Sequence, residues 1–326
     1  MATGPFPAKD KLTIGFAHAA YQLGARFEVR NTGINTFEVR NSAQLEERIG
    51  EADVLVVSGM WRNELLAKAP KLRFVQSISA GVNQYDQAMF RAKSVRLASA
   101  QGVNEVAVAE HAMALMLGLL RQLHVARDNQ RAKHWRPMIA DIPAREDELR
   151  GKTLLIVGYG RIGQRLAKLA KAFDMHVIGV RRSTGGASGP ADEVRTIAEM
   201  AHVLPMADVV ALTCPLTPET TGLIGAAAFG AMKRSALLVN VARGAVVDEV
   251  ALIEALQKGA IGGVGIDVTV EEPLPAGSQL WACDNALITP HTAGETQAYE
   301  DNVLDILMEN LDRLWRGETK LRNEIV

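Results

Sequence analysis

Short apolar runs alternate with helix-like stretches along the whole chain. Runs rich in Val, Ile and Leu predict strands at residues 11–16, 52–58, 72–78 and 95–99. A second series predicts strands at residues 153–158, 176–180, 208–213, 236–241, 263–268 and 286–290. Strands that alternate with helices are typical of parallel sheets covered by helices, so the pattern predicts an α/β protein.

Two long helices are predicted between and after these series. Residues 104–130 form one helix that is apolar on most faces, which favours burial between domains or subunits. A polar stretch at residues 131–152 follows it. Residues 295–317 predict an amphipathic helix that is long enough to return to the first domain. The helix at 104–130 is therefore a candidate domain boundary.

Length and composition add three expectations. The chain has 326 residues, more than a single core normally holds, so two domains are expected. Apolar residues make up 48%, and the net charge of −1 provides no excess to attract nucleic acid or anionic lipid. The only cysteines, Cys214 and Cys283, have neither metal-ligand nor disulfide-framework spacing, so we expect no metal site and a reducing compartment.

Nothing in the pattern indicates a membrane or secreted protein. The N-terminal residues 1–11 lack the apolar core of a signal peptide, and the longest apolar stretch is interrupted by Glu110 and His111. A cytoplasmic location is expected.

A glycine turn at residues 158–163 has the context of a dinucleotide-binding motif. An apolar strand leads into Gly158, Gly160 and Gly163, and a helix follows. The first glycine permits a tight turn, the second lets the backbone approach a pyrophosphate, and the third allows close helix packing. The intervening residues Tyr159, Arg161 and Ile162 are then expected beside the phosphates, with the amides of the last two at a helix N-terminus.

The next predicted strand ends at a pair of arginines, Arg181 and Arg182. A carboxylate at this place holds the ribose 2′-hydroxyl of NAD, whereas a positive pair fits the 2′-phosphate of NADP. The sequence therefore favours NADP, with NAD possible. The alternative is that both arginines are solvated and only tolerate a phosphate.

Three residues with suitable chemistry follow later strands. Arg243, Glu272 and His291 each lie on a turn at a strand end, where α/β sheets place their ligands. Reduction of a keto acid requires a cation for the carboxylate, a proton donor for the carbonyl oxygen and a partner for the donor. Each residue alone is also compatible with a structural role, so the joint pattern carries the hypothesis.

Together these residues resemble the D-isomer-specific 2-hydroxyacid dehydrogenases over nearly the whole chain. Besides GYGRIG, the similar segments are ISAGVNQYD (78–86), VAEHAMALMLGLLRQL (108–123), TCPLTPETTGLI (213–224), NVARGAVVDEVAL (240–252), GIDVTVEEPLP (265–275) and LITPHTAGET (287–296). The resemblance implies hydride transfer between a nicotinamide cofactor and a small 2-keto acid. It implies Arg243, Glu272 and His291 as the catalytic residues, with Arg243 and His291 also binding substrate.

The same resemblance implies further sites and an architecture. The backbone of Ala80, Gly81 and Val82 would bind the substrate carboxylate, and Asp267 would bind the nicotinamide carboxamide. Val241 and Ala242 would lie beside the nicotinamide ring, and Cys214 and Pro215 would lie along the cofactor. It implies two doubly wound parallel-sheet domains: a flavodoxin-like substrate domain formed by residues 1–102 and 296–326, and a Rossmann domain at 103–295. It also implies a homodimer built on the helix after Asn104.

Several alternatives remain open within this resemblance. The arginine pair and the TPHTAGET segment look most like glyoxylate and hydroxypyruvate reductases. Transcriptional corepressors resembling these dehydrogenases can keep the Arg, Glu and His, although the compact chain has no docking segments. Formate-dehydrogenase-like enzymes have Gln where this chain has Glu272. Trp61, Trp135 and Trp281 could each line a pocket or simply pack.

Overall fold

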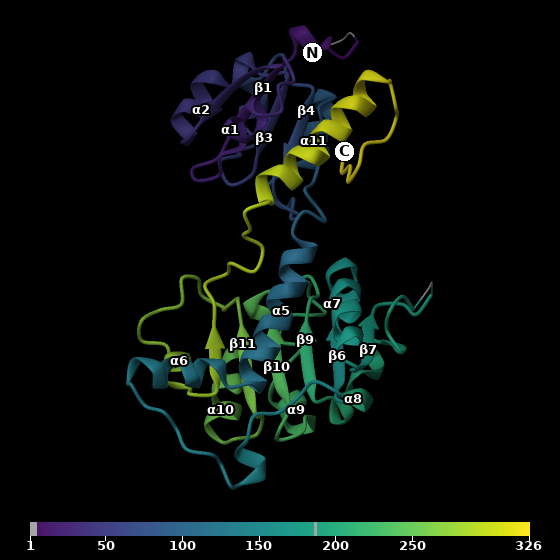
Figure 1. Cartoon of the computed structure of the whole chain (residues 1–326). Coiled ribbons are helices and arrows are strands. Elements are labelled where there is room, and N and C mark those ends of the chain that lie inside the picture. The colour runs from purple at the N-terminus through teal and green to yellow at the C-terminus, as the bar shows by residue number, and fades with distance from the viewer. Residues whose placement is uncertain (1–4, 186–187) are drawn as a thin grey trace. The chain divides into compact units, whose positions relative to one another are not determined.

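The computed structural model describes residues 5–185 and 188–326. The chain divides into two compact units: unit 1 comprises Met1–Asn104 and Thr296–Val326, and unit 2 comprises Glu105–Glu295 (Figure 1). Residues 1–4, at the start of the first expected domain, and residues 186–187 lie outside the described part. The sequence-based boundaries lie near these divisions, and a substrate-binding role for unit 1 stays a prediction.

Unit 1 contains a five-stranded sheet in the order β2-β1-β3-β4-β5. Its strands are β1 (Thr13–Ala17), β2 (Asn35–Val39), β3 (Val54–Val57), β4 (Phe74–Ser77) and β5 (Arg96–Ala98). All neighbouring strands are parallel. This is the flavodoxin-like order, in which the chain reverses direction across the sheet between β1 and β3.

Helices cover both faces of this sheet. On one face, α1 (Leu23–Glu28) and α11 (Tyr299–Trp315) share a core with Ile14, Val56 and Phe74. On the other face lie α2 (Ser42–Arg48), α3 (Leu65–Lys68) and α4 (Gln87–Lys93). The C-terminal helix thus returns to the core of unit 1.

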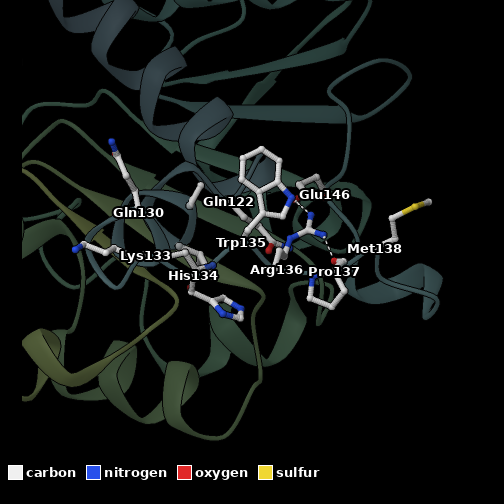
Figure 2. A pocket seen from close by; sticks show the side chains of 12 residues that line it. Gln122, Gln130, Lys133, His134, Trp135, Arg136, Pro137, Met138 and Glu146 are labelled. Carbon is white, nitrogen blue, oxygen red and sulfur yellow. Dashed lines mark hydrogen bonds and ion pairs between the residues drawn. The ribbon is translucent and has the colours of Figure 1, made fainter.

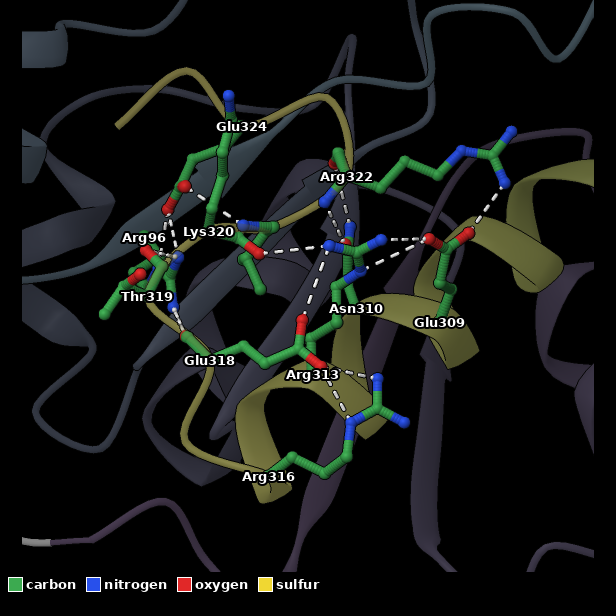
Figure 3. A network of polar contacts seen from close by, with 11 residues as sticks. Arg96, Glu309, Asn310, Arg313, Arg316, Glu318, Thr319, Lys320, Arg322 and Glu324 are labelled. Carbon is green, nitrogen blue, oxygen red and sulfur yellow. Dashed lines mark hydrogen bonds and ion pairs between the residues drawn. The ribbon is translucent and has the colours of Figure 1, made fainter.

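The C-terminal segment protects the edge strand β5. Leu97 donates its N–H to the carbonyl of Val326 (2.9 Å), and Ile325 donates to Leu97 (2.8 Å). Figure 3 shows the polar network that fixes this segment, in which buried Asn310 accepts from the backbone of Arg322 (2.7 Å). Asn310 also donates to Gln76 in β4 (3.1 Å). A paired edge cannot recruit a strand from another chain.

Unit 2 contains a seven-stranded parallel sheet in the order β12-β11-β10-β9-β6-β7-β8. Its strands are β6 (Thr153–Val157), β7 (His176–Arg181), β8 (Glu193–Thr196), β9 (Val209–Leu212), β10 (Leu237–Asn240), β11 (Gly263–Ile266) and β12 (Ala286–Ile288). The order extends the Rossmann order by one strand, with its switch point between β6 and β9. The expected fold class is confirmed.

The helices of unit 2 also form two layers. One face carries α5 (Glu105–Leu120) and α7 (Arg161–Ala172), whose buried residues pack on Leu154, Ile156 and Val239. The other face carries α8 (Met200–Val203), α9 (Ala226–Ala231) and α10 (Glu249–Gln257). α6 (Leu123–Arg131) buries none of its residues.

The prediction of a single helix at residues 104–130 is wrong. It is two helices, α5 and α6, bent by 66° at a break where Gln122 adopts a left-handed conformation (φ 49°). The apolar pattern that buries α5 ends at Leu120, so nothing holds the next turns against the sheet. Among the described residues, no single helix is long and apolar enough to span a membrane. Taken together, the bent pair of α5 and α6 reaches the necessary length and apolar content.

Two strands were absent from the sequence-based assignment, and both lie at sheet edges. β2 has the sequence NTFEV and β8 the sequence EVRT, and neither has an apolar run. An edge strand needs only part of its surface buried and commonly carries charged side chains. Apolar runs therefore identified the interior strands and missed these two edges.

Candidate active site

The glycine turn joins β6 to α7 at the switch point of the unit 2 sheet. Gly158 has φ 101°, and a Cβ on it would lie 2.3 Å from the backbone nitrogen of Cys214. A Cβ on Gly163 would lie 2.8 Å from the carbonyl of Gly158. Both glycines are therefore required for packing, whereas Gly160 faces open space up to 4.0 Å.

The helix that follows this turn begins without a side-chain cap. Gly160 is its N-cap, and the first helical residues are Arg161, Ile162 and Gly163. Uncapped amides and the positive end of the helix dipole favour an anion. Together with the open space at Gly160, this start fits the pyrophosphate of a dinucleotide.

Tyr159 points away from that open space. Its side chain is buried, its hydroxyl donates to the carbonyl of Ser188 (2.9 Å), and the N–H of Ala191 donates to it (2.9 Å). Its ring occupies the space that a Cβ on Gly179 would need. Any contact of Tyr159 with a dinucleotide would therefore use its backbone.

The arginine pair lies at the end of β7, beside the glycine turn. The amides of Gly158 and Tyr159 both donate to the carbonyl of Val180 (2.9 and 2.8 Å), which directly precedes Arg181. Arg181 is half-buried and donates to the carbonyl of Thr184 (3.2 Å), while Arg182 is exposed. The pKa of Glu219 is lowered by its hydrogen bond with Thr217 and, less strongly, by the charge of Arg182.

The loops after β9 and β10 border the same edge of the sheet. Cys214 is buried and touches Gly158, and burial raises the pKa of its thiol to about 11, which keeps it protonated and unreactive. Val241 and Ala242 are buried directly after β10. Pro215 is exposed next to Cys214.

Arg243 is held in an extended conformation by its neighbours. Buried Asn240 accepts from the N–H of Ala242 (3.0 Å) and donates to the carbonyl of Arg243 (3.1 Å). The Arg243 guanidinium donates to the carbonyl of Ala242 (2.6 Å), and the side chain is exposed. Asn240 was missed from the sequence, and its signal is an amide that ends the apolar strand LLVN.

Gly244 brings the Arg243 turn against the turn that carries Glu272. A Cβ at this position would lie 2.0 Å from the carbonyl carbon of Thr269 and 2.4 Å from the nitrogen of Val270. Since both atoms belong to the backbone, no side-chain rotation could relieve the overlap. Gly244 thus positions two of the three candidate catalytic loops relative to each other.

We expect Gly244→Ala to separate these two turns. The variant should lose about 1 to 3 kcal/mol of unfolding free energy, the usual cost of overpacking, and its turnover should fall. The control is Gly230→Ala in α9, where a Cβ meets nothing within 4 Å. Thermal melts and steady-state rates for both variants check this, and a Gly244→Ala protein with parental stability and rate would contradict it.

Glu272 and His291 form a hydrogen-bonded pair. His291 Nδ1 lies 2.7 Å from Glu272 Oε2, and the N–H of Thr269 donates to Glu272 Oε1 (3.1 Å). An ionised carboxylate only accepts, so Nδ1 carries the proton and Nε2 is left for another partner. The His291 side chain is 48% exposed and the Glu272 side chain 39%, which leaves the pair accessible to a ligand.

Asp267 holds the backbone of the His291 turn. Its carboxylate, 2% exposed, accepts from the hydroxyl of Thr289 (2.6 Å) and the N–H groups of Thr292 and Ala293 (2.9 Å each). Its own carbonyl accepts from the N–H of His291 (2.8 Å), which is left-handed (φ 55°). Both carboxylate oxygens of Asp267 therefore already accept hydrogen bonds from the protein, and a contact with a carboxamide stays a prediction.

The remaining predicted residues fall elsewhere. In unit 1, Ala80 and Gly81 are exposed and Val82 is half-buried, beyond the end of β4. Trp61 is 1% exposed and packs on Phe90, and Trp281 donates to the carbonyl of Pro275 (3.0 Å). Trp135 is 96% exposed. Within the described ranges, no group of three His, Cys, Asp or Glu residues could hold a metal ion.

Arg243, Glu272 and His291 follow β10, β11 and β12, which are neighbours in the sheet (Figure 1). All three thus lie at the same carboxyl edge as the glycine turn. A cation, a carboxylate–imidazole pair and a dinucleotide cradle on one edge are suited to hydride transfer coupled to proton transfer.

Comparison with known proteins identifies the family. The model of the D-isomer specific 2-hydroxyacid dehydrogenase NAD-binding domain matches residues 113–293. Glyoxylate reductase of Pyrococcus furiosus is 35% identical over 295 residues, which cover 87% of this chain and 86% of that protein. D-3-phosphoglycerate dehydrogenase of Methanocaldococcus jannaschii is 34% identical over 84% of this chain, which spans only 52% of that longer relative.

A solved structure agrees with these relatives. A D-isomer specific 2-hydroxyacid dehydrogenase family protein from Aeromonas salmonicida superposes with a TM-score of 0.82 at 31% identity, covering 97% of this chain and 99% of that one. The family model lies inside unit 2, so this unit is the nicotinamide-dinucleotide-binding domain. The chain therefore belongs to the D-isomer specific 2-hydroxyacid dehydrogenases, oxidoreductases that interconvert 2-keto acids and 2-hydroxy acids.

Proposed function

We propose that the protein reduces a small 2-keto acid, glyoxylate or hydroxypyruvate, to its D-2-hydroxy acid, with NADPH as the preferred donor. The observation that carries this proposal is the His291–Glu272 pair at 2.7 Å, on the same sheet edge as Arg243 and the glycine turn. The similarity to a glyoxylate reductase over most of both chains supports the substrate class. The enzyme would also catalyse the reverse oxidation.

Each residue has a defined task in this proposal. The bound nicotinamide supplies or accepts the hydride. Arg243 binds the substrate carboxylate and polarises the carbonyl, together with the backbone N–H groups around Gly81. His291 gives its Nε2 proton to the carbonyl oxygen, and Glu272 stabilises the charged imidazole through Nδ1.

The remaining cofactor contacts are proposed from the glycine turn and from the family resemblance. Gly158, Gly160 and Gly163 with the amides of Arg161 and Ile162 would hold the pyrophosphate. Cys214, Pro215, Val241 and Ala242 would line the cofactor, and Asp267 would face the carboxamide. The roles of these residues, the absence of a metal and the cytoplasmic location stay predictions.

One assay separates an enzyme from a dinucleotide-binding platform of the corepressor kind. Purified protein is incubated with glyoxylate, hydroxypyruvate or pyruvate and either NADPH or NADH, and oxidation of the cofactor is followed. We expect turnover of glyoxylate and hydroxypyruvate. Binding of a dinucleotide without turnover of any keto acid would reject the proposal in favour of a platform.

The preference for NADPH is supported by the end of β7. Residues 181–185 are Arg-Arg-Ser-Thr-Gly and include no carboxylate to hold a 2′-hydroxyl. Arg181 follows directly after the carbonyl that anchors the glycine turn, whereas Arg182 lies one residue further along the chain. Arg181 is therefore the better candidate for the 2′-phosphate.

We expect Arg181→Asp to reverse the cofactor preference. A charge-assisted contact contributes about 1.5 to 3 kcal/mol, or roughly ten-fold to over a hundred-fold in binding. The control, Arg150→Asp, makes the same charge change at an exposed site before β6. The ratio of kcat/KM for NADPH to that for NADH is measured in all three proteins. Equal values in the unmodified protein would contradict the preference.

A homodimer is proposed on α6 and the segment after it. Leu123, Trp135, Met138 and Ile142 are 57%, 96%, 97% and 72% exposed. Of these four, Trp135 and Met138 line a groove of about 690 Å³ formed by α6, residues 133–138 and Glu146 (Figure 2). Monomers rarely expose so many large apolar side chains together, and a second copy of the chain would bury them.

We expect the protein to be a dimer in solution and Trp135→Glu/Met138→Glu to make it a monomer. Two charges in an apolar interface remain unpaired on association, which is unfavourable. The control is Val250→Glu on α10, a side chain that is 69% exposed outside this surface. Light scattering gives the mass of each protein, and a monomeric parent would refute the dimer.

A further inference from the structure

His111 on α5 contacts the turn that carries the proposed proton donor. His111 Nε2 lies 2.8 Å from the hydroxyl oxygen of Thr289, and that hydroxyl lies 2.6 Å from Asp267 Oδ1. We propose that His111 is a positioning residue for His291, acting through Thr289 and Asp267. The inference rests on the proposed function of His291 as the proton donor.

Asp267, at the end of this hydrogen-bond chain, determines which group donates and which accepts at each step. The N–H groups of Thr292 and Ala293 donate to Oδ1 and Oδ2 of Asp267, so both carboxylate oxygens act as acceptors. The Thr289 hydroxyl has one proton, which it gives to Asp267. Its oxygen must therefore accept from His111, which requires that Nε2 of His111 carries a proton.

The same chain determines the backbone around His291. Asp267 is bonded to Thr289, His291, Thr292 and Ala293, through its carboxylate or its carbonyl. His291 is held in a left-handed conformation (φ 55°) that is uncommon for residues with a side chain and carries a conformational cost. Loss of one anchor would let this turn relax and withdraw Nδ1 from Glu272.

Little water can reach the hydrogen bonds among His111, Thr289 and Asp267 to replace them. Asp267 is 2% exposed and the His111 side chain 23%. His111 Nε2 is also 3.6 Å from Asp267 Oδ1, so Asp267 is a charged group that faces it from the end of β11, and Thr289 is its polar contact from the end of β12. A buried, satisfied network of this kind fixes one geometry, whereas a partly broken one does not.

The test compares isosteric and conservative variants in the complete protein. Thr289→Val removes the hydroxyl, and His111→Leu removes the donor. Thr289→Ser keeps the hydroxyl, and in His111→Gln the amide N–H can replace Nε2–H. We expect each of the first two to lower kcat/KM for glyoxylate about ten-fold, with the double variant no worse than the poorer single one, and the conservative pair to remain within two- or three-fold of the parent.

Two further readouts separate positioning from a general loss of structure. The dissociation constant for NADPH should change little, because the pyrophosphate site at the glycine turn is built from other loops. The alkaline limb of the pH profile for reduction should move to lower pH in Thr289→Val and His111→Leu. Histidine ¹⁵N spectra of the parent, assigned with His111→Gln, should show His111 protonated at Nε2. This spectrum of the parent tests the hydrogen-bond chain even if Thr289→Val or His111→Leu does not fold.

The outcomes also distinguish this inference from the proposed function. Parental kcat/KM and pH profile in both Thr289→Val and His111→Leu, with an inactive His291→Ala, would overturn the positioning role alone. A His111 that is protonated only at Nδ1 would do the same. Full activity in His291→Ala would instead reject the proposed proton donor.

Discussion

Replacing Arg243 with lysine is expected to lower kcat/KM for glyoxylate and hydroxypyruvate by about a hundred-fold. Lysine keeps the positive charge but loses the planar pair of N–H groups that matches a carboxylate. Loss of one charge-assisted hydrogen bond costs about 1.5 to 3 kcal/mol, which corresponds to roughly ten-fold to over a hundred-fold. Both kcat and KM should change, because the guanidinium is proposed to bind the substrate and to polarise its carbonyl.

The structure makes this experiment specific. Asn240 fixes the backbone on both sides of Arg243, and the Arg243 side chain is exposed, so the variant should fold normally. The matched control is Arg234→Lys, an exposed arginine before the amino end of the same strand β10. If Arg243→Lys and Arg234→Lys both match the parent on both keto acids, Arg243 has only a structural role.

The sheets were predictable wherever burial imposed an apolar run. The strand VLVV at β3 is buried throughout, and the apolar signal alone identifies it. β2 and β8 lie at edges, where polar side chains are tolerated and the signal disappears. The break at Gln122 separates a helix with buried residues from one with none, and that difference belongs to the tertiary structure.

The candidate site was predictable where one local motif contains the chemistry. The glycine turn needs only its own strand and helix, and the structure shows why two of its glycines are required. Contacts between distant segments were missed. Gly244 against Thr269 and His111 against Thr289 join residues that are separated along the chain by other strands, so no spacing rule could reveal them.

His291→Ala is expected to lower turnover by roughly 10² to 10⁴, the contribution of a positioned general acid. NADPH binding should change little, because the pyrophosphate site at the glycine turn is built from other loops. The control is His202→Ala, an exposed histidine on α8. Steady-state kinetics and NADPH titration of both variants check this, and near-normal turnover in His291→Ala would refute the acid assignment.

Glu272→Gln tests the partner of that acid through turnover. Glutamine keeps the size of the side chain and a hydrogen-bonding oxygen near His291 Nδ1, at 2.7 Å in the parent, but removes the negative charge beside the imidazole. The side chain can then no longer stabilise a positively charged donor, so kcat/KM for reduction should fall about ten-fold, the equivalent of about 1.4 kcal/mol. Solvent screening at this half-exposed pair argues against a larger effect. Glu271→Gln, the exposed neighbour, should match the parent. Parental kcat/KM in Glu272→Gln would show that the contact does not support the donor.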